Sequence, residues 1–199
     1  SLPSTARLVC IVQENEVCAV RSIHLRNTTG LVLAPGKISV FEEGRIAANA
    51  SFPPMLPGDD QLVPIGQDST VSILRSCTNK RHVSAVTPFQ LEEGKVTGVV
   101  VEHKHQRVTS YVIQNNATKT VDMFYLDHTA SPGYDGFQIM TSEHCVKEAV
   151  GFARYMFRLQ PQEELHFDVV EEAVERTLHS KLLQIKEFLK AQAPQLQEE

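Results

Sequence analysis

The stretch from Leu25 to Arg75 separates short apolar runs by turns built from Asn, Gly and Pro, and this pattern constrains the fold most. Ala34-Pro35-Gly36 joins a residue that fixes φ to one that tolerates positive φ, which favours a type II turn. Pro53-Pro54 and Pro57 exclude a central strand there, because proline removes a ladder hydrogen bond. Short strands between such turns are typical of antiparallel sandwiches or barrels.

A second set of strands begins near residue 90. Thr109, Tyr111 and Ile113 alternate with their neighbours at a period of two, which indicates a half-buried strand. Residues 76–88 are polar, and we expect them to form a loop. We therefore predict a mostly β protein, an antiparallel β-sandwich in two tiers, with residues 1–80 in the first tier and 90–170 in the second.

The period changes after Val169. Apolar residues then recur at intervals of three or four, at Val170, Val174, Leu178, Leu182, Ile185 and Leu189. This spacing predicts a C-terminal amphipathic α-helix over residues 171–193, and Pro194 lies beyond its end. Such a helix either docks on its own domain or binds a helical partner.

Charge and hydropathy exclude two kinds of partner. The chain has 24 acidic and 19 basic residues and a net charge of −5, which is a poor match to the phosphates of nucleic acid. No apolar run is long enough to span a membrane. We expect a protein partner or a homo-oligomer, bound through the C-terminal helix or an exposed strand edge.

Cysteines and glycosylation motifs bear on the compartment. Cys10, Cys18, Cys77 and Cys145 form no C-x-x-C pair, so we expect small buried side chains in a reducing, cytoplasmic compartment. A bridge between Cys10 and Cys18 is an alternative. Glycosylation motifs at Asn27, Asn49 and Asn116 keep an extracellular location open.

Few residues indicate catalysis or metal binding. His103 and His105 are two apart, so on a strand both point the same way, as some metal sites require. His128, His144 and His166 have no recognised spacing to them, and no phosphate-binding, hydrolase or zinc-protease motif occurs. We therefore expect no catalytic, cofactor-binding or metal-binding residue.

Several segments resemble a known family. Leu33-Ala34-Pro35-Gly36-Lys37-Ile38-Ser39-Val40-Phe41-Glu42-Glu43-Gly44, Leu56-Pro57-Gly58-Asp59-Asp60 and Ile65-Gly66-Gln67-Asp68-Ser69-Thr70-Val71 are similar to the C-terminal domain of unknown function of mucoidy-inhibitor-A-like proteins. The likeness extends over about residues 20–170. It implies a β-sandwich-rich domain, often preceded by a coiled coil, with no established catalytic residues.

The leading hypothesis is a non-catalytic β-sandwich module for protein–protein interaction, acting as a scaffold in a larger structural or cytoskeletal assembly. Candidate partner-binding residues are Val174, Leu178, Leu182, Ile185 and Leu189 of the expected helix, with Arg154 and Arg158 on one face of a strand. One alternative is a metal-dependent hydrolase that uses His103 and His105. Another is an extracellular or envelope adhesion module.

Overall fold

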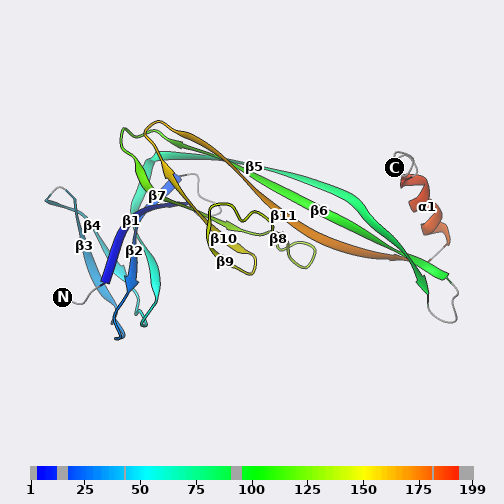
Figure 1. Ribbon diagram of the computed structural model, residues 1–199, viewed down its shortest axis with the longest axis horizontal. Helices are drawn as coiled ribbons and strands as arrows, with labels where there is room; N and C mark the ends of the chain where they lie inside the picture. The colour runs from blue at the N-terminus through cyan, green and yellow to red at the C-terminus, as the bar shows by residue number, and fades with distance from the viewer. Residues whose placement is uncertain (1–3, 13–17, 43, 91–95, 181, 193–199) are drawn as a thin grey trace. The chain divides into compact units, whose positions relative to one another are not determined.

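The computed structural model describes residues 4–12, 18–42, 44–90, 96–180 and 182–192 (Figure 1). The strands are β1 (Ser4–Val12), β2 (Cys18–Asn27), β3 (Gly36–Glu42), β4 (Arg45–Phe52), β5 (Asp60–Gln90), β6 (Val96–Asn115), β7 (Val121–Thr129), β8 (Gln138–Ile139), β9 (Cys145–Ala149), β10 (Phe152–Leu159) and β11 (Glu164–His179). The helix α1 spans Leu182–Gln192. The prediction of a mostly β protein with a C-terminal helix is confirmed.

Hydrogen bonding joins the strands into two sheets. The larger has nine strands in the order β8-β11-β6-β5-β2-β1-β7-β10-β9, and the smaller is the hairpin of β3 and β4. The registered pairs are antiparallel except β1 with β7, which is parallel. A sandwich in two tiers is not confirmed by this arrangement.

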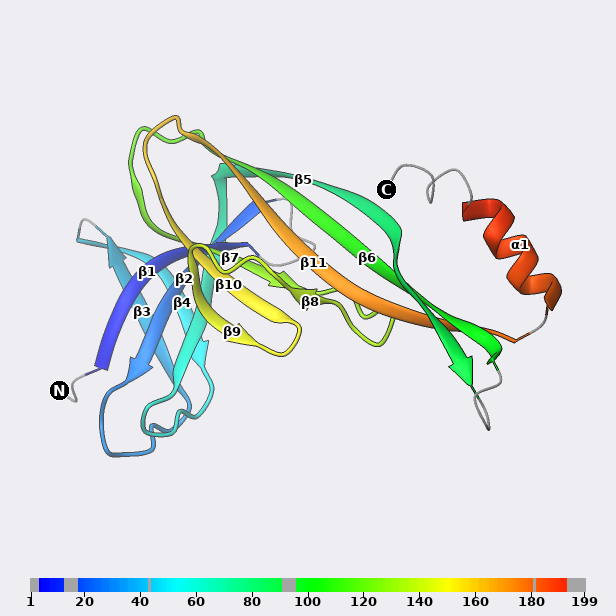
Figure 2. The ribbon, with the colours of Figure 1, turned by 45° about the vertical axis from the view of Figure 1, so that its right-hand side comes forward.

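The chain forms two compact units. Unit 1 comprises residues 1–76, 109–129 and 141–169, and unit 2 comprises residues 77–108, 130–140 and 170–199. The long strands β5, β6 and β11 each contribute to both. In unit 2 they are the main strands and lie side by side (Figure 2).

The expected loop at residues 76–88 is wrong, because these residues continue β5. Their side chains are mostly exposed, so they lack the apolar alternation that identifies a half-buried strand. Hydrogen bonding to β6 forms the strand instead.

The expected helix start at residue 171 is also wrong, since β11 continues to His179 and α1 begins at Leu182. The burial of β11 alternates through Phe167, Val169, Glu171 and Ala173. Glu171 is fully buried at a position where the alternation calls for an apolar residue. Because of this charged residue, the apolar pattern of the sequence does not show the period of two expected for a strand. The four-residue spacing of Val174 and Leu178 then resembles that of an amphipathic helix.

Unit 1 has an apolar core. One cluster joins Ile23 and Leu25 of β2 to Met55 and Val63. Another contains aromatic rings, where Phe167 lies 4.8 Å from Tyr155 and 4.9 Å from Phe157, measured between ring centroids. Edge-to-face contacts of this kind add to the stabilisation from burial.

Unit 1 also contains the same polar arrangement twice. The side-chain amide of Asn27, at the end of β2, donates to the carbonyls of Leu31, Met55 and Leu56. The amide of Asn115, at the end of β6, donates to those of Lys119, Leu159 and Gln160. In each case one acceptor is the carbonyl of the residue four positions later in the sequence. The other two are carbonyls of consecutive residues in a distant segment.

The two distant segments turn in the same way. Leu56-Pro57-Gly58-Asp59 and Gln160-Pro161-Gln162-Glu163 each place a positive φ after the proline, 85° at Gly58 and 61° at Gln162. The last carboxylate of each accepts the N–H of the first residue. The two segments therefore share an order of elements. A strand (β2 or β6) is followed by an antiparallel pair, then by the proline turn, and then by a long strand (β5 or β11).

Candidate functional site

Val174 and Leu178 lie on β11 and are 49% and 47% exposed. Ser84 of β5 and Arg176 of β11 both contact Glu102 of β6, so these side chains share one face of the sheet in unit 2. We call this side the Glu102 face. Because side chains alternate along a strand, Val174 and Leu178 lie on the Glu102 face, on either side of Arg176.

In the described part of the chain, the outer backbone edge of β11 is paired only near the middle of the strand. The two residues of β8 face Glu171 and Glu172, and the carbonyl of Val170 accepts the N–H of Met140 at 2.8 Å. Outward-pointing backbone groups recur every second residue. The N–H and C=O of Val174, Arg176 and Leu178 therefore point outward, and in the described part of the chain no strand pairs with them.

A strained turn ends the pairing by β8. The N–H of Gly136 donates to the carbonyl of Gly133 at 3.0 Å, and φ is 53° at Tyr134 and 62° at Asp135. This is the geometry of a type I′ turn, which usually takes Asn and Gly at its centre. Non-glycine residues in the left-handed region are costly and persist where contacts hold them.

Contacts with the opposite face of the sheet hold this turn. The Tyr134 ring stacks on His105 of β6, with centroids 3.8 Å apart and planes at 21°. The N–H of Ser131 donates to the buried carboxylate of Glu171 at 2.7 Å. These contacts hold the turn against the face that carries His105 and Glu171.

A pocket of about 320 Å³ lies beside the start of the unpaired edge. It is lined by Lys104, Tyr134, Asp135, Gly136, Gln138, Met140, Glu172, Ala173 and Val174. Met140 and Tyr134 are about half exposed. The pocket offers apolar surface next to backbone groups that can hydrogen-bond.

Charges on the Glu102 face are paired within the chain. Lys104 lies 2.7 Å from Glu172, and Arg176 lies 2.9 Å from Glu102. The hydrogen bond from Lys104 lowers the pKa of Glu172, and the hydrogen bonds from Ser84 and Arg176 lower that of Glu102. The face thus combines exposed apolar side chains with neutralised charge pairs.

His103 and His105 are both buried on the opposite face of β6, as their spacing predicts. His105 Nε2 lies 3.0 Å from Glu175 Oε2, which also accepts from Arg81 at 3.1 Å. The hydrogen bond from His105 lowers the pKa of Glu175. Nδ1 of His103 is buried without a hydrogen-bond partner, and burial, followed by the charge of Arg81, lowers its pKa.

These histidines do not form a metal site in the described structure. Within residues 4–12, 18–42, 44–90, 96–180 and 182–192, no group of three or more potential ligands could hold a metal ion. Glu175 and Tyr134 are the contacts of His105 instead. The metal-dependent hydrolase therefore lacks structural support.

Arg154 and Arg158 are each bound within the chain. Arg154 makes a two-pronged ion pair with Asp127, at 2.6 and 2.8 Å, and lies over the Tyr125 ring. The hydrogen bond to Asp127 raises the pKa of Arg154. Arg158 lies 3.2 Å from Asp122, and both side chains are exposed. The strand that carries them, β10, lies between β7 and β9.

Of the predicted helix residues, Ile185 is partly buried on α1. The side chains of Leu182 and Leu189 lie outside the described residues. Phe188 of α1 stacks on His179 at the end of β11, with centroids 5.5 Å apart. The structure therefore brings Val174 and Leu178 together on a strand and separates them from the helix.

The structure describes the surroundings of two cysteines and of the three asparagines in glycosylation motifs. Cys77 is exposed and Cys145 is partly exposed, both free, so the expectation that they are buried is wrong. The side chains of Cys10 and Cys18 lie outside the described residues. The Asn27 amide is fully buried and hydrogen-bonded, which leaves no room for a glycan in the fold. Asn49 and Asn116 are exposed.

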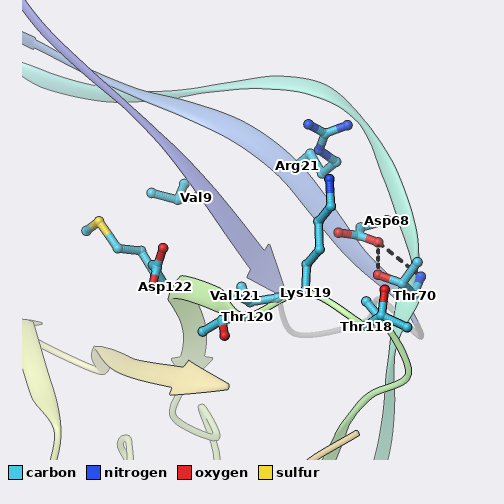
Figure 3. Close-up of a pocket in the computed structure, with 11 residues that line it drawn as sticks. Val9, Arg21, Asp68, Thr70, Thr118, Lys119, Thr120, Val121 and Asp122 are labelled. Atoms are coloured by element: carbon cyan, nitrogen blue, oxygen red, sulfur yellow. Dashed lines mark hydrogen bonds between the residues drawn. The ribbon is translucent and has the colours of Figure 1, made fainter. Parts of the chain in front are cut away.

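Unit 1 contains a larger pocket of about 600 Å³ (Figure 3). Figure 3 shows Lys119 extended beside Asp68 toward Arg21, with Asp68 bonded to Thr70. Asp122, also at the pocket, pairs with Arg158. The pocket thus contains charges of both signs and no concentration of one sign.

No protein-family model, curated protein or solved structure matches the chain. Among the described helices, none is long and apolar enough to cross a membrane. Any assignment of function therefore depends on the surfaces described above.

Proposed function

We propose that this chain is a non-catalytic protein-interaction module that binds an extended strand along the outer edge of β11. The observation that carries the proposal is the row of outward backbone groups at Val174, Arg176 and Leu178, flanked by exposed apolar side chains. Strand addition obtains affinity from main-chain hydrogen bonds and specificity from pockets for alternate side chains. The pocket beside Val174 supplies such a position.

The other long edge of unit 2 is less suited to pairing. The outer edge of β5 carries Lys80, Arg81 and Pro88, and proline cannot donate a ladder hydrogen bond. Charges and proline are the devices that protect edge strands from unwanted pairing. The residues of β11 from Ala173 to His179 contain no proline.

The wider role proposed here is that of a scaffold in a structural or cytoskeletal assembly. We also propose that the sheets stack in two tiers and that the chain is related to the mucoidy-inhibitor-A-like family. The exposed turns and paired surface charges support a binding role over a catalytic one.

The test uses a soluble, extended peptide of alternating valine and threonine as probe. In NMR titration with the peptide in large excess, so that it outcompetes any other strand at this edge, we expect the amide signals of Val174, Arg176 and Leu178 to shift on binding. The same peptide N-methylated at alternate residues lacks the required donors and should not bind. Shifts confined to other strands, or equal binding by both peptides, would contradict the proposal.

Two matched variants sharpen the test. Val174→Lys places a charge at the edge and should abolish peptide binding. Val86→Lys alters a residue of similar exposure on β5 and should leave it unchanged. Equal effects of the two variants would rule out a site specific to β11.

A further inference from the structure

We infer that the strand bound at the edge of β11 is the β11 of a second copy of this chain, paired antiparallel about a two-fold axis at Arg176. This inference rests on the proposed function and names its partner.

The backbone places a two-fold axis naturally at Arg176. Arg176 presents both its N–H and its C=O to the outer edge, by the periodicity set at Val170. In an antiparallel pair, such a residue exchanges two hydrogen bonds with the residue opposite. With Arg176 opposite its own copy, Val174 pairs with Leu178 of the second copy, and Leu178 with its Val174.

This register matches the exposed side chains. Val174 and Leu178 are both about half exposed and flank Arg176 at equal distances in sequence. The pairing covers each with an apolar partner, and cross-strand pairs of this kind are the unit of sheet stabilisation. A shift by one residue would move them to opposite faces and lose both contacts.

Two like charges lie opposite each other at the axis, which by itself disfavours the pairing, and each is compensated within its own chain. The axis brings Arg176 near its own copy, but each guanidinium already lies 2.9 Å from Glu102 of its own chain. The result is a symmetric row of Glu102, Arg176, Arg176 and Glu102 across the two chains, in which each arginine has a glutamate beside it. On the other face, Glu175 would lie opposite Thr177, whose hydroxyl can donate to it.

The cavity beside Val174 adds room for the partner. Val174, Met140 and Tyr134 line this cavity of about 320 Å³. In the proposed register, Leu178 of the second copy lies next to Val174 and therefore beside the cavity. A large apolar side chain at position 178 thus has a place to bury.

The experiment exploits the reciprocal register. The full chain should sediment at twice its 22.2 kDa across the micromolar range. Val174→Lys alone and Leu178→Glu alone should each sediment as a monomer. The double variant should regain the dimer, because each new lysine then faces a glutamate of the other copy. Within one chain the two positions lie about 13 Å apart on the strand, too far to pair.

A cross-link provides a second readout. In a hydrogen-bonded antiparallel pair the Cα atoms lie about 5.5 Å apart, within the range for a disulfide. Arg176→Cys, in a chain with Cys77→Ser and Cys145→Ser, should therefore form a disulfide with itself on oxidation. Glu175→Cys in the same background faces Thr177 and should cross-link far less. Mass spectrometry identifies the linked residues.

The outcomes separate the two proposals. If the double variant stays monomeric and Arg176→Cys does not link to itself, the second copy is wrong. Should the valine–threonine peptide still bind at β11 in that case, the strand-addition function stands with another partner. Failure of peptide binding as well would overturn both. Circular dichroism checks that every variant is folded.

Discussion

At the scale of single residues, buried amides organise the turns of unit 1. Asn27 and Asn115 are fully buried, and each also accepts the N–H of the residue two positions onward at 3.0 Å. One side chain therefore closes its own turn and ties it to a distant segment. Neither aspartate nor alanine provides both the donors and the acceptor in that geometry.

We expect Asn27→Ala and Asn115→Ala to destabilise the fold by similar amounts, because each removes three side-chain hydrogen bonds to backbone carbonyls. The free energy of unfolding should fall by about 0.5–1.5 kcal/mol for each hydrogen bond lost. Urea denaturation measures the change. The exposed Asn49, whose amide oxygen accepts from the Ser39 hydroxyl, is the matched control and should show little effect when changed to alanine.

The sequence predicts a turn at Asn27 but not the burial of the Asn27 side chain. The composition of Asn27-Thr28-Thr29-Gly30 indicates a turn correctly. The acceptors at Met55 and Leu56 are distant in sequence, so local turn chemistry carries no sign of them. The same motif looks like a glycosylation site on local grounds, although the folded chain buries it.

At the scale of elements, β11 shows how one polar residue misleads a periodicity argument. Leu165, Phe167 and Val169 predict a strand correctly, and Glu171 then breaks the apolar series. Its carboxylate is compensated by the N–H of Ser131 and lies 3.9 Å from Arg107. Both partners are distant in sequence, which is why the residues around Val174 and Leu178 look helical in isolation.

Two ion pairs link β10 to β7, and we expect the Arg154–Asp127 pair to contribute more to stability than the Arg158–Asp122 pair. Arg154→Ala leaves the carboxylate of Asp127, which is 7% exposed, without its partner. We expect a loss of about 3–5 kcal/mol in stability, since breaking a buried pair strands a charge. Arg158→Ala removes an exposed pair and should cost less than about 1 kcal/mol.

Thermal denaturation of the two arginine variants compares these costs directly. Similar losses for both would contradict the structural role assigned to Arg154. The comparison also bears on their predicted part in partner binding, because a partner site would require Arg154 to leave Asp127.

At the scale of the whole molecule, His103 couples stability to pH. Its pKa lies below the ordinary 6.5, mainly through burial, and it faces Arg81, Glu175, His105 and His179. The unfolded chain therefore takes up the proton first as the pH falls. The contribution of His103 to stability is complete above pH 6.5 and is lost as the pH falls from there through its folded pKa.

We expect the difference in melting temperature between about pH 7.5 and about pH 5 to be smaller in His103→Gln than in the unchanged chain. Glu102, Glu172 and Glu175 have pKa values lowered from 4.5, so their contributions change below this window. The exposed His166 serves as control, since its substitution should leave the difference largely intact. An identical pH response in all three proteins would refute the role of His103.

Pro88 has a consequence for how far association can proceed. A protein with one free strand edge forms a dimer and associates no further. A protein with two free strand edges can add copies at both and grow into a fibre. Because Pro88, Lys80 and Arg81 protect the outer edge of β5, unit 2 offers the edge of β11 for association. A proline on one strand edge thus sets the stoichiometry, and it separates a finite complex from a growing fibre.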